Sequence, residues 1–256
     1  MTKQGHSAWF DLFVSDIEKA KTFYGELFNW STEEWRMDAA APAYTMFKVD
    51  GKPMGGVTAP VDSAVNNSWL AYVTVENIDA AITVLKKNSG QVLLEEQIPS
   101  VGRYAIAKDA QGAVFAPFEP ENKNEPVATH ARAPIGNFCW HELMCSDREK
   151  AFGFYKDVFG WDKGEAIDMG PMGVYQIYNN QGSAMGGIMN ITPDMPIKTP
   201  YWLEYVRVDN VDATIERALK LGGHATFPAM DVGDGGRIAG FVDNQGVQCA
   251  VWSGAK

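Results

Sequence analysis

The chain has 256 residues, of which 46% are hydrophobic and 12% aromatic, enough to bury one or two substantial cores. Its net charge of −10 argues against nucleic acid or an anionic membrane surface as a partner, because both require a basic face. The sequence has no apolar run of 18 residues, and its opening MTKQGHSAWF lacks the apolar stretch of a signal peptide, so we expect a cytoplasmic protein without a membrane anchor. The three cysteines show no paired metal-binding or redox spacing, which fits that compartment.

The predicted elements begin with a strand and a helix that the chain contains twice. Residues 9–30 read WFDLFVSDIEKAKTFYGELFNW, and residues 140–161, which are 131 positions later, read WHELMCSDREKAFGFYKDVFGW. In each copy an S-x-x-E capping box, Ser15 with Glu18 and Ser146 with Glu149, predicts the helix start. The helices end at Trp30 and Trp161, which we expect to be buried.

The rest of each copy continues the same pattern. In the first copy we expect, in order, strands near 32–35, 44–49 and 55–59, a strand at 69–75, a helix at 78–87, and strands at 103–108 and 113–118. The Gly-Gly pair in the third of these strands favours a turn or bulge, and Asn77 opens the second helix. Each copy is therefore two β-α-β-β-β units, an α+β fold with curved mixed sheets that form a cup.

A repeat of about half the chain indicates two copies of a domain. We place the first module at residues 1–120 and the second at 135–256. The polar, proline-bearing segment 121–134 has no counterpart near the start and is the expected linker. Each module is expected to fold around a core of its own.

The motifs F-Y-x-x-x-F-x-W, D-x-x-G, W-x-[DE]-L, M-G-G and G-R-x-A give the chain a family resemblance. Together they resemble the vicinal oxygen chelate superfamily, which includes glyoxalase I, extradiol dioxygenases and bleomycin-resistance proteins, and within it the two-module glyoxalase-like proteins. The resemblance spans essentially the whole chain and implies tandem modules of this fold. It does not specify the function, since one scaffold carries many chemistries.

The resemblance also implies where a metal would bind. Metal-dependent members carry a His on the first strand, a His or Glu on the strand before the second helix and a Glu on the last strand. These positions correspond here to Trp9 and Trp140, Leu70 and Leu203, and Ala116 and Ala250. None of these side chains can bind a metal, so we expect no metal site of this kind and no cofactor.

An alternative register would restore part of the metal site. A shift of one residue brings His141 and Glu204 to two of the ligand positions, beside Glu142. Such a shift moves each side chain to the opposite face of its sheet, so both strands would have to shift together. A metal-dependent lyase or dioxygenase that uses these displaced ligands remains an alternative.

Two acidic residues are the candidate catalytic groups. Asp11 and Glu142 each follow a repeated Trp by two positions and so share its strand face. A carboxylate among aromatic side chains in a cup would be desolvated and could act as a general base or bind a hydrogen-bond donor. A structural role is also open, in which Arg103 and Arg237 pair with these acids; otherwise the arginines meet an anionic ligand.

The repeated aromatic residues are the candidate ligand-binding groups. They are Trp9, Tyr72, Trp140 and Tyr205, to which Arg103 and Arg237 are added. Repeated aromatic side chains on central strands also occur as plain core residues.

We therefore expect a glyoxalase-like protein that binds or transforms a small molecule in aromatic-lined cups. Were it an enzyme, the resemblance implies a lyase or an oxygenase. A non-catalytic protein that sequesters a drug, as in the bleomycin-resistance branch, is a further alternative, and the acids would suit a cationic drug. The expected partner is a small-molecule ligand, and the protein is expected to be a monomer or a homodimer.

Overall fold

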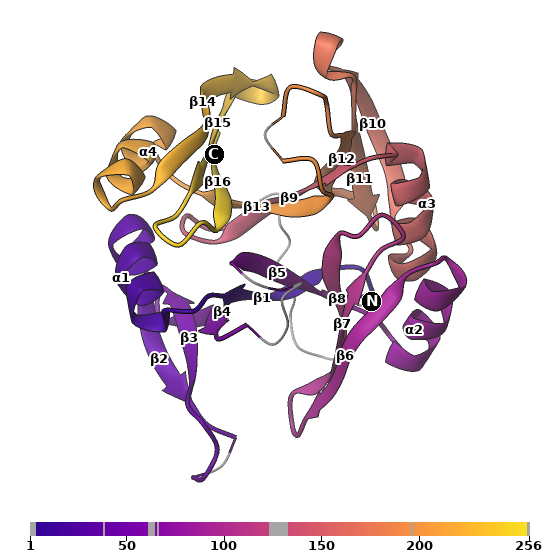
Figure 1. Ribbon diagram of the computed structural model, residues 1–256, viewed down its shortest axis with the longest axis vertical. Coiled ribbons are helices and arrows are strands. Elements are labelled where there is room, and N and C mark those ends of the chain that lie inside the picture. Colours follow the sequence, from indigo (N-terminus) through magenta and orange to yellow (C-terminus); the bar gives the residue numbers. More distant parts are fainter. Residues whose placement is uncertain are drawn as a thin grey trace. The chain divides into compact units, whose positions relative to one another are not determined.

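The computed structural model repeats one order of elements, β-α-β-β-β, four times along the chain (Figure 1). It describes residues 4–37, 39–60, 65, 67–122, 133–195 and 197–254, so most of the expected linker lies outside the described residues. The first two repeats are β1 (Ser7–Phe13), α1 (Ile17–Phe28), β2 (Ser31–Trp35), β3 (Tyr44–Val49), β4 (Lys52–Thr58), then β5 (Ser68–Thr74), α2 (Ile78–Lys87), β6 (Gln91–Ile98), β7 (Gly102–Lys108) and β8 (Val114–Pro120). The last two are β9 (Phe138–Cys145), α3 (Arg148–Phe159), β10 (Asp162–Asp168), the short 3-10 helix η3 (Gly170–Met172), β11 (Val174–Asn180), β12 (Ser183–Asn190), then β13 (Tyr201–Arg207), α4 (Val211–Lys220), β14 (His224–Val232), the 3-10 helix η4 (Gly233–Gly235), β15 (Gly236–Val242) and β16 (Gln248–Ser253).

The strands of each module form one mixed, eight-stranded sheet. The orders are β2-β3-β4-β1-β5-β8-β7-β6 and β10-β11-β12-β9-β13-β16-β15-β14. Within each repeat the first strand pairs in parallel with the last, as β1 does with β4 and β9 with β12, and each of the three later strands is antiparallel to the next. The predicted α+β fold of two tandem modules, each made of two such units, is confirmed.

The helix starts differ from the predicted capping box by one residue. Asp16 caps α1 by accepting a hydrogen bond from the amide of Lys19 at 2.9 Å, and Asp147 caps α3 by accepting from Lys150 at 3.1 Å. The prediction that the preceding serines are the caps is therefore wrong. Both residue types are good caps, but an aspartate also places a full negative charge at the positive end of the helix dipole.

The apolar core does not follow the module boundaries. One compact unit comprises residues 1–9, 71–131 and 140–202, and in it α2 and α3 lie side by side (Figure 1). The other comprises residues 10–70, 132–139 and 203–256 and contains the contact of α1 with α4. The expectation of a separate core for each module is wrong, because each unit takes half of its elements from each module.

A pair of buried hydrogen bonds explains this arrangement. The hydroxyl of Tyr155 on α3 donates to Asp109 at 3.0 Å, and that of Tyr24 on α1 donates to Asp243 at 3.1 Å. The acids belong to the D-x-x-G turns, so each module's first helix is bonded to the last turn of the other module. Sequence periodicity shows that a helix has an apolar face, but not which module that face meets.

The prediction that Trp30 and Trp161 are buried is confirmed. Trp30 and Trp161 are 5% and 2% exposed, and their indole nitrogens donate to the carbonyls of Gly136 and Gly5, each at 2.8 Å. The three cysteines are buried and form no disulfide. Within the described ranges, no helix is long and apolar enough to cross a membrane.

Candidate functional site

The acidic residue on the first strand is bonded to a tyrosine. Asp11 on β1 is 8% exposed and lies directly opposite Gly56 of β4 in the parallel register. Tyr44, at the start of strand β3 on the far side of β4, donates a hydrogen bond from its hydroxyl to the Asp11 carboxylate. The candidate catalytic acid of the first module is thus held by a tyrosine from the same compact unit.

The second module repeats this arrangement with a longer acid. Glu142 on β9 lies opposite Gly187 of β12, and the hydroxyl of Tyr175 on β11 is hydrogen-bonded to its carboxylate. The indole nitrogen of Trp140 donates to the same hydroxyl oxygen at 2.7 Å. Burial, and next the Glu142 charge, raise the pKa of Tyr175 well above its ordinary value, so this phenol keeps its proton at neutral pH. Trp140, Glu142 and Tyr175 are all partly exposed.

The M-G-G motif leaves space for this tyrosine. A Cβ on Gly187 would lie 2.0 Å from the ring carbon Cζ of Tyr175, and one on Gly56 would lie 1.9 Å from the Tyr44 hydroxyl oxygen. The first glycine of each pair allows a close approach of the neighbouring strand's backbone, since a Cβ on Gly186 would lie 1.9 Å from the carbonyl oxygen of His141. We call the space above the second glycine the glycine slot. The bulge expected beside the pair is confirmed, since the ladder shifts register there in both modules.

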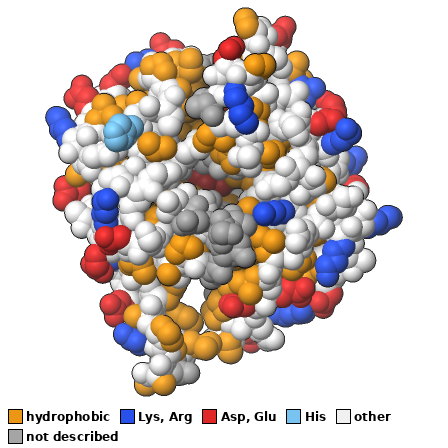
Figure 2. Space-filling view, in the orientation of Figure 1, with side chains coloured by type: hydrophobic (Ala, Val, Ile, Leu, Met, Phe, Trp, Pro, Cys, Tyr) orange, Lys and Arg blue, Asp and Glu red, His pale blue; other side chains and the backbone are white. Residues whose placement is uncertain are grey.

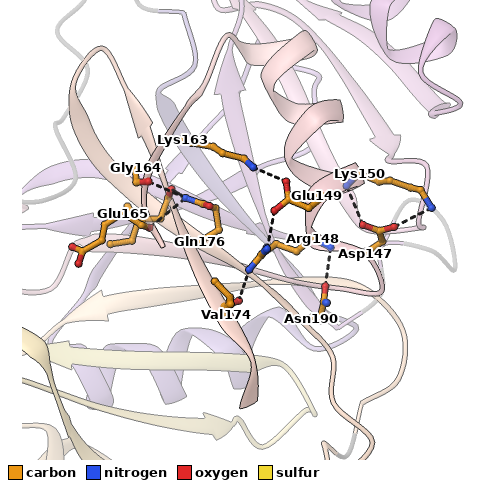
Figure 3. Close-up of polar contacts among 11 residues, drawn as sticks. Asp147, Arg148, Glu149, Lys150, Lys163, Gly164, Glu165, Val174, Gln176 and Asn190 are labelled. Carbon is orange, nitrogen blue, oxygen red and sulfur yellow. Dashed lines mark hydrogen bonds and ion pairs between the residues drawn. The ribbon is translucent and has the colours of Figure 1, made fainter. Parts of the chain in front are cut away.

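Strand β11 is anchored on both sides of Tyr175, through the contacts of Val174 and Gln176 that Figure 3 draws. The Arg148 guanidinium at the start of α3 donates to the carbonyl of Val174 at 3.2 Å and bonds Glu149 at 2.7 Å. The buried amide of Gln176 donates to the Gly164 carbonyl at 3.0 Å, across the bulge of β10. Both residues flanking Tyr175 are therefore bonded to neighbouring elements, which fixes the backbone that carries its ring.

The two candidate arginines bind other acids. Arg103 forms two bonds of 2.9 Å to Asp79, near the start of α2. Arg237 bonds Asp212, near the start of α4, at 2.8 and 2.9 Å, and Asp231 at 2.6 Å. The predicted pairing of these arginines with Asp11 and Glu142 is not supported, because their guanidinium groups are taken up by these partly or largely exposed acids.

The repeated aromatic residues differ in exposure. Tyr72 is 6% exposed, with its ring 5.3 Å from that of Tyr104, and Tyr205 is 3% exposed. Trp9 is partly exposed, as Trp140 is. Tyr201 at the start of β13 is also partly exposed, and burial together with the Glu142 charge raises its pKa to about 12.

Sequence reasoning missed three tyrosines of this site. Tyr44 and Tyr175 recur at the same spacing as the rest of the repeat, and each precedes a Gly-Gly pair, so a signal was present. What the sequence lacks is the strand order that brings β3 near β1 and β11 near β9. Tyr201 has no aromatic counterpart in the first module, where Ser68 begins β5.

Two of the displaced metal ligands, His141 and Glu142, lie on opposite faces of their strand. His141 is 2% exposed, and because neighbouring residues of a strand point to opposite faces, it lies across the sheet from Glu142. Glu204 on β13 is 1% exposed and, as the neighbour of Leu203, points to the opposite face of its strand from Leu203. The grouping of His141, Glu142 and Glu204 around one ion is therefore not supported, and among the described residues no three His, Cys, Asp or Glu side chains are placed to hold a metal. The side chains at the family's own ligand positions do not fit a metal either, since Trp, Leu and Ala offer no ligand atom.

On the face drawn in Figure 2, basic side chains are dispersed among acidic and apolar ones. This dispersal accords with the net charge of −10.

Comparison with known proteins places this geometry in a family. The family model described as the Glyoxalase/Bleomycin resistance protein/Dioxygenase superfamily matches residues 6–116 and 137–251. The anthracycline biosynthesis protein DauV of Streptomyces sp. (strain C5) is 27% identical over 96% of this chain and 92% of its own length. The putative glyoxylase CFP32 of Mycobacterium bovis is 33% identical over 44% of each chain. Among solved structures, the Mn(II)-bound glyoxalase from Novosphingobium aromaticivorans is similar with a TM-score of 0.62 at 14% identity, covering 100% of this chain and 83% of that one, which shows the fold alone.

Proposed function

Because the chain belongs to the Glyoxalase/Bleomycin resistance protein/Dioxygenase superfamily, we propose that it binds or transforms a small aromatic molecule at the Trp140–Tyr175–Glu142 site of the second module. Glu142 is the proposed acceptor and general base, and Trp140 the aromatic surface against which the ligand packs. The proposal includes no conventional metal centre. Asp11 with Tyr44 is the proposed counterpart in the first module.

The observation that carries the proposal is the repeated bond between a strand carboxylate and a tyrosine. A buried or half-buried carboxylate is costly unless it is bonded, so a fold with no use for one would be expected to carry an apolar residue there. The chain instead carries an acid, a tyrosine and a slot glycine in both modules. Repetition of the whole group supports a role beyond the packing of one strand.

The second module is the better candidate for ligand binding. Glu142 is partly exposed, whereas Asp11 is 8% exposed, so a ligand reaches the longer acid more readily. A second aromatic residue, Tyr201, lies close enough for the Glu142 charge to raise its pKa. Such a mixture of aromatic surface and one charged group is typical of small-molecule sites.

The relatives favour small-molecule chemistry of this kind. DauV, which matches over nearly its whole length, is named for anthracycline biosynthesis. For this chain we propose only that its ligand is an organic molecule of a comparable type. The drug-sequestering and catalytic versions of the proposal share the same site and differ in whether the ligand is altered.

The test is binding of planar hydroxylated aromatic probes, 2-naphthol and 1,2-dihydroxyanthraquinone, to the whole chain. The indole N–H signal of Trp140, assigned with Trp140→Phe, reports on the site in nuclear magnetic resonance spectra. We expect Glu142→Gln to weaken binding at least about tenfold while leaving the melting temperature nearly unchanged, as for loss of a charged hydrogen bond to the ligand. Glu165→Gln, which removes an exposed carboxylate from β10, is the matched control.

Two results would contradict the proposal. The first is that neither probe perturbs the Trp140 signal at millimolar concentration. The second is a large loss of melting temperature in Glu142→Gln with unchanged probe affinity, which would make the carboxylate structural. Incubation of a bound probe followed by mass spectrometry distinguishes a catalytic protein from a purely binding one.

A further inference from the structure

We infer that the ligand surface of the second module extends across the sheet to its edge strand β10, where Ile167 determines specificity for flat, apolar molecules longer than two fused rings. The inference rests on the proposed function and specifies the size of the ligand at the same site. Trp35 is the counterpart of Ile167 in the first module.

Ile167 lies on the same face of the sheet as Tyr175. The antiparallel register places Ile167 of β10 directly opposite Tyr175 of β11, and residues paired in this way point to the same side. Ile177, two residues after Tyr175, shares this face, whereas Gln176 between them points away from it and is buried. Ile167 is 37% exposed, and Tyr175 and Ile177 are partly exposed. An apolar strip therefore continues from the tyrosine to the edge of the sheet.

The aromatic side chains of this surface use their polar groups within the protein. The indole N–H of Trp140 donates to the hydroxyl oxygen of Tyr175 at 2.7 Å. The ring of Tyr175 lies on the backbone of β12, where a Cβ on Gly187 would approach its Cζ within 2.0 Å. The surface that remains is mainly aromatic and aliphatic, which suits a flat apolar molecule.

The size of the ligand follows from the width of this surface. Strands β9, β12, β11 and β10 are consecutive neighbours, so Trp140 on β9 and Ile167 on β10 are three strand spacings apart, about 14 Å along the sheet. A two-ring molecule that packs against Trp140 is shorter than this path and leaves Ile167 uncovered. A third fused ring extends the contact towards the edge strand.

The first module repeats this arrangement with a larger side chain. Trp35 on β2 lies directly opposite Tyr44 on β3, as Ile167 lies opposite Tyr175. Trp35 is partly exposed, and the other residues of both edge strands are mostly polar or charged. A large apolar side chain beside the slot tyrosine is thus present in both modules, on strands that otherwise carry few such residues.

One extra residue hides this match in the sequence. At the repeat's offset of 131, Trp35 corresponds to Ala166, as Tyr44 does to Tyr175. The two ladders differ from that correspondence, because a β-bulge in β10 takes up one residue and leaves Ile167 opposite the tyrosine. In a strand that kept regular alternation from its start, Ile167 would point to the other face.

Buried hydrogen bonds hold the bulge in place. The side-chain amide of Gln176, which is 4% exposed, donates to the carbonyls of Gly164 and Glu165 at 3.0 and 3.3 Å (Figure 3). A bulge disrupts the ladder locally, and a buried polar side chain is costly unless it is bonded. The amide satisfies both requirements, and the geometry that it stabilises keeps Ile167 on the face of Tyr175.

The experiment compares 2-naphthol with 2-hydroxyanthracene, which carries the same hydroxyl on three fused rings. Dissociation constants are measured from the fluorescence anisotropy of each probe, titrated with the whole chain at neutral pH. We expect 2-hydroxyanthracene to bind at least about fivefold more tightly, because its third ring removes further apolar surface from water. In Ile167→Thr, which keeps a β-branched side chain suited to a strand, this preference should fall to within about twofold.

Val174→Thr is the matched control. Val174 is 37% exposed, as Ile167 is, but it precedes Tyr175 in β11 and so points to the opposite face. The preference for the third ring should therefore stay within about twofold of that of the original chain. Ile167→Trp, which introduces the side chain of Trp35, should raise the preference at least about twofold through a larger aromatic contact.

The outcomes separate this inference from the proposed function. Equal binding of the two probes by the original chain, or an equal loss of preference in Ile167→Thr and Val174→Thr, overturns the inference and leaves the proposed site standing. Binding of neither probe overturns both. If Ile167 instead covers an interface with a second copy of the chain, Ile167→Thr weakens self-association in sedimentation and leaves the probe ratio unchanged, which also overturns the inference. The original chain and Ile167→Trp decide the question even if Ile167→Thr fails to fold.

Discussion

Replacing Tyr155 by Phe tests the buried bond that joins the two modules. Tyr155 has no exposed surface, and its hydroxyl donates to Asp109 at 3.0 Å and accepts from the indole nitrogen of Trp202 at 3.1 Å. Removal of the oxygen leaves the ring in place, so the cavity is small. The cost comes from the two hydrogen bonds that are lost.

The magnitude follows from what each partner retains. Asp109 is 5% exposed and keeps bonds from the amides of Gln111 and Ala113 at 2.8 and 3.0 Å, but it loses one bond to a charged group, worth about 1.5–3 kcal/mol. Trp202 loses the acceptor of its indole proton, a neutral bond worth about 1 kcal/mol. We expect the free energy of unfolding at neutral pH to fall by about 2–4 kcal/mol.

The assay is urea unfolding followed by both circular dichroism and tryptophan fluorescence. Because Tyr155 belongs to the second module and Asp109 to the first, we expect one transition seen by both probes, shifted as a whole. Tyr104→Phe, at a surface bond, should change the free energy by less than about 0.5 kcal/mol. A loss below about 1 kcal/mol in Tyr155→Phe, or separate transitions for the two modules, would refute the idea of shared cores.

Four other outcomes are expected. Asp16→Ala should lower the free energy of unfolding by about 1 kcal/mol, and Ser15→Ala by much less, as measured by urea unfolding, because Asp16 caps α1. A larger loss in Ser15→Ala than in Asp16→Ala would identify Ser15 as the cap. Truncating Trp30 or Trp161 to Ala should each cost about 3–5 kcal/mol, and a cost below about 1 kcal/mol at both would contradict their burial. Burial raises the pKa of Asp109 above its unfolded value, so its contribution to stability is complete below about pH 4 and is lost as the pH rises through the folded pKa; Asp109→Asn should make the pH dependence of unfolding shallower above about pH 4, and an unchanged slope would contradict the shift. Protein purified without chelator should carry far less than one transition metal per chain by elemental analysis, and a stoichiometric tightly bound metal would contradict the proposed metal-free site.

The order of elements could be predicted because it depends on local signals. Strand alternation, helical spacing and the turn at residues 109–112 are each visible within a short stretch, and the repeat provides a second reading of every element. The same alternation placed Asp11 and Glu142 as polar groups in apolar strands. The capping error was also local: in the sequence Ser-Asp, either side chain can reach the first amides of the helix.

The partners of these acids could not be predicted because they depend on strand order. Tyr44 is near Asp11 since β4 alone separates β3 from β1, a neighbour relation that no spacing in the sequence states. The partner of Arg103 could not be predicted for the same reason: Arg103 follows a glycine at the start of β7, and only the packing of α2 brings Asp79 to its guanidinium. The packing of each module's first helix against the other module likewise depends on which apolar faces meet.

The proposed site can be compared with the metal sites that the family resemblance implies. In metal sites, an outer partner bonded to each ligand fixes its orientation and tunes its charge. Tyr175 has that relation to Glu142, two residues beyond Trp140, the position at which the family resemblance implies a metal ligand. A carboxylate oriented in this way can bind a donor or accept a proton without an ion, provided that its geometry is fixed before the ligand arrives. In the proposed site the glycine slot supplies that condition in both modules, so the two glycines, and not only the acid, are part of the proposal.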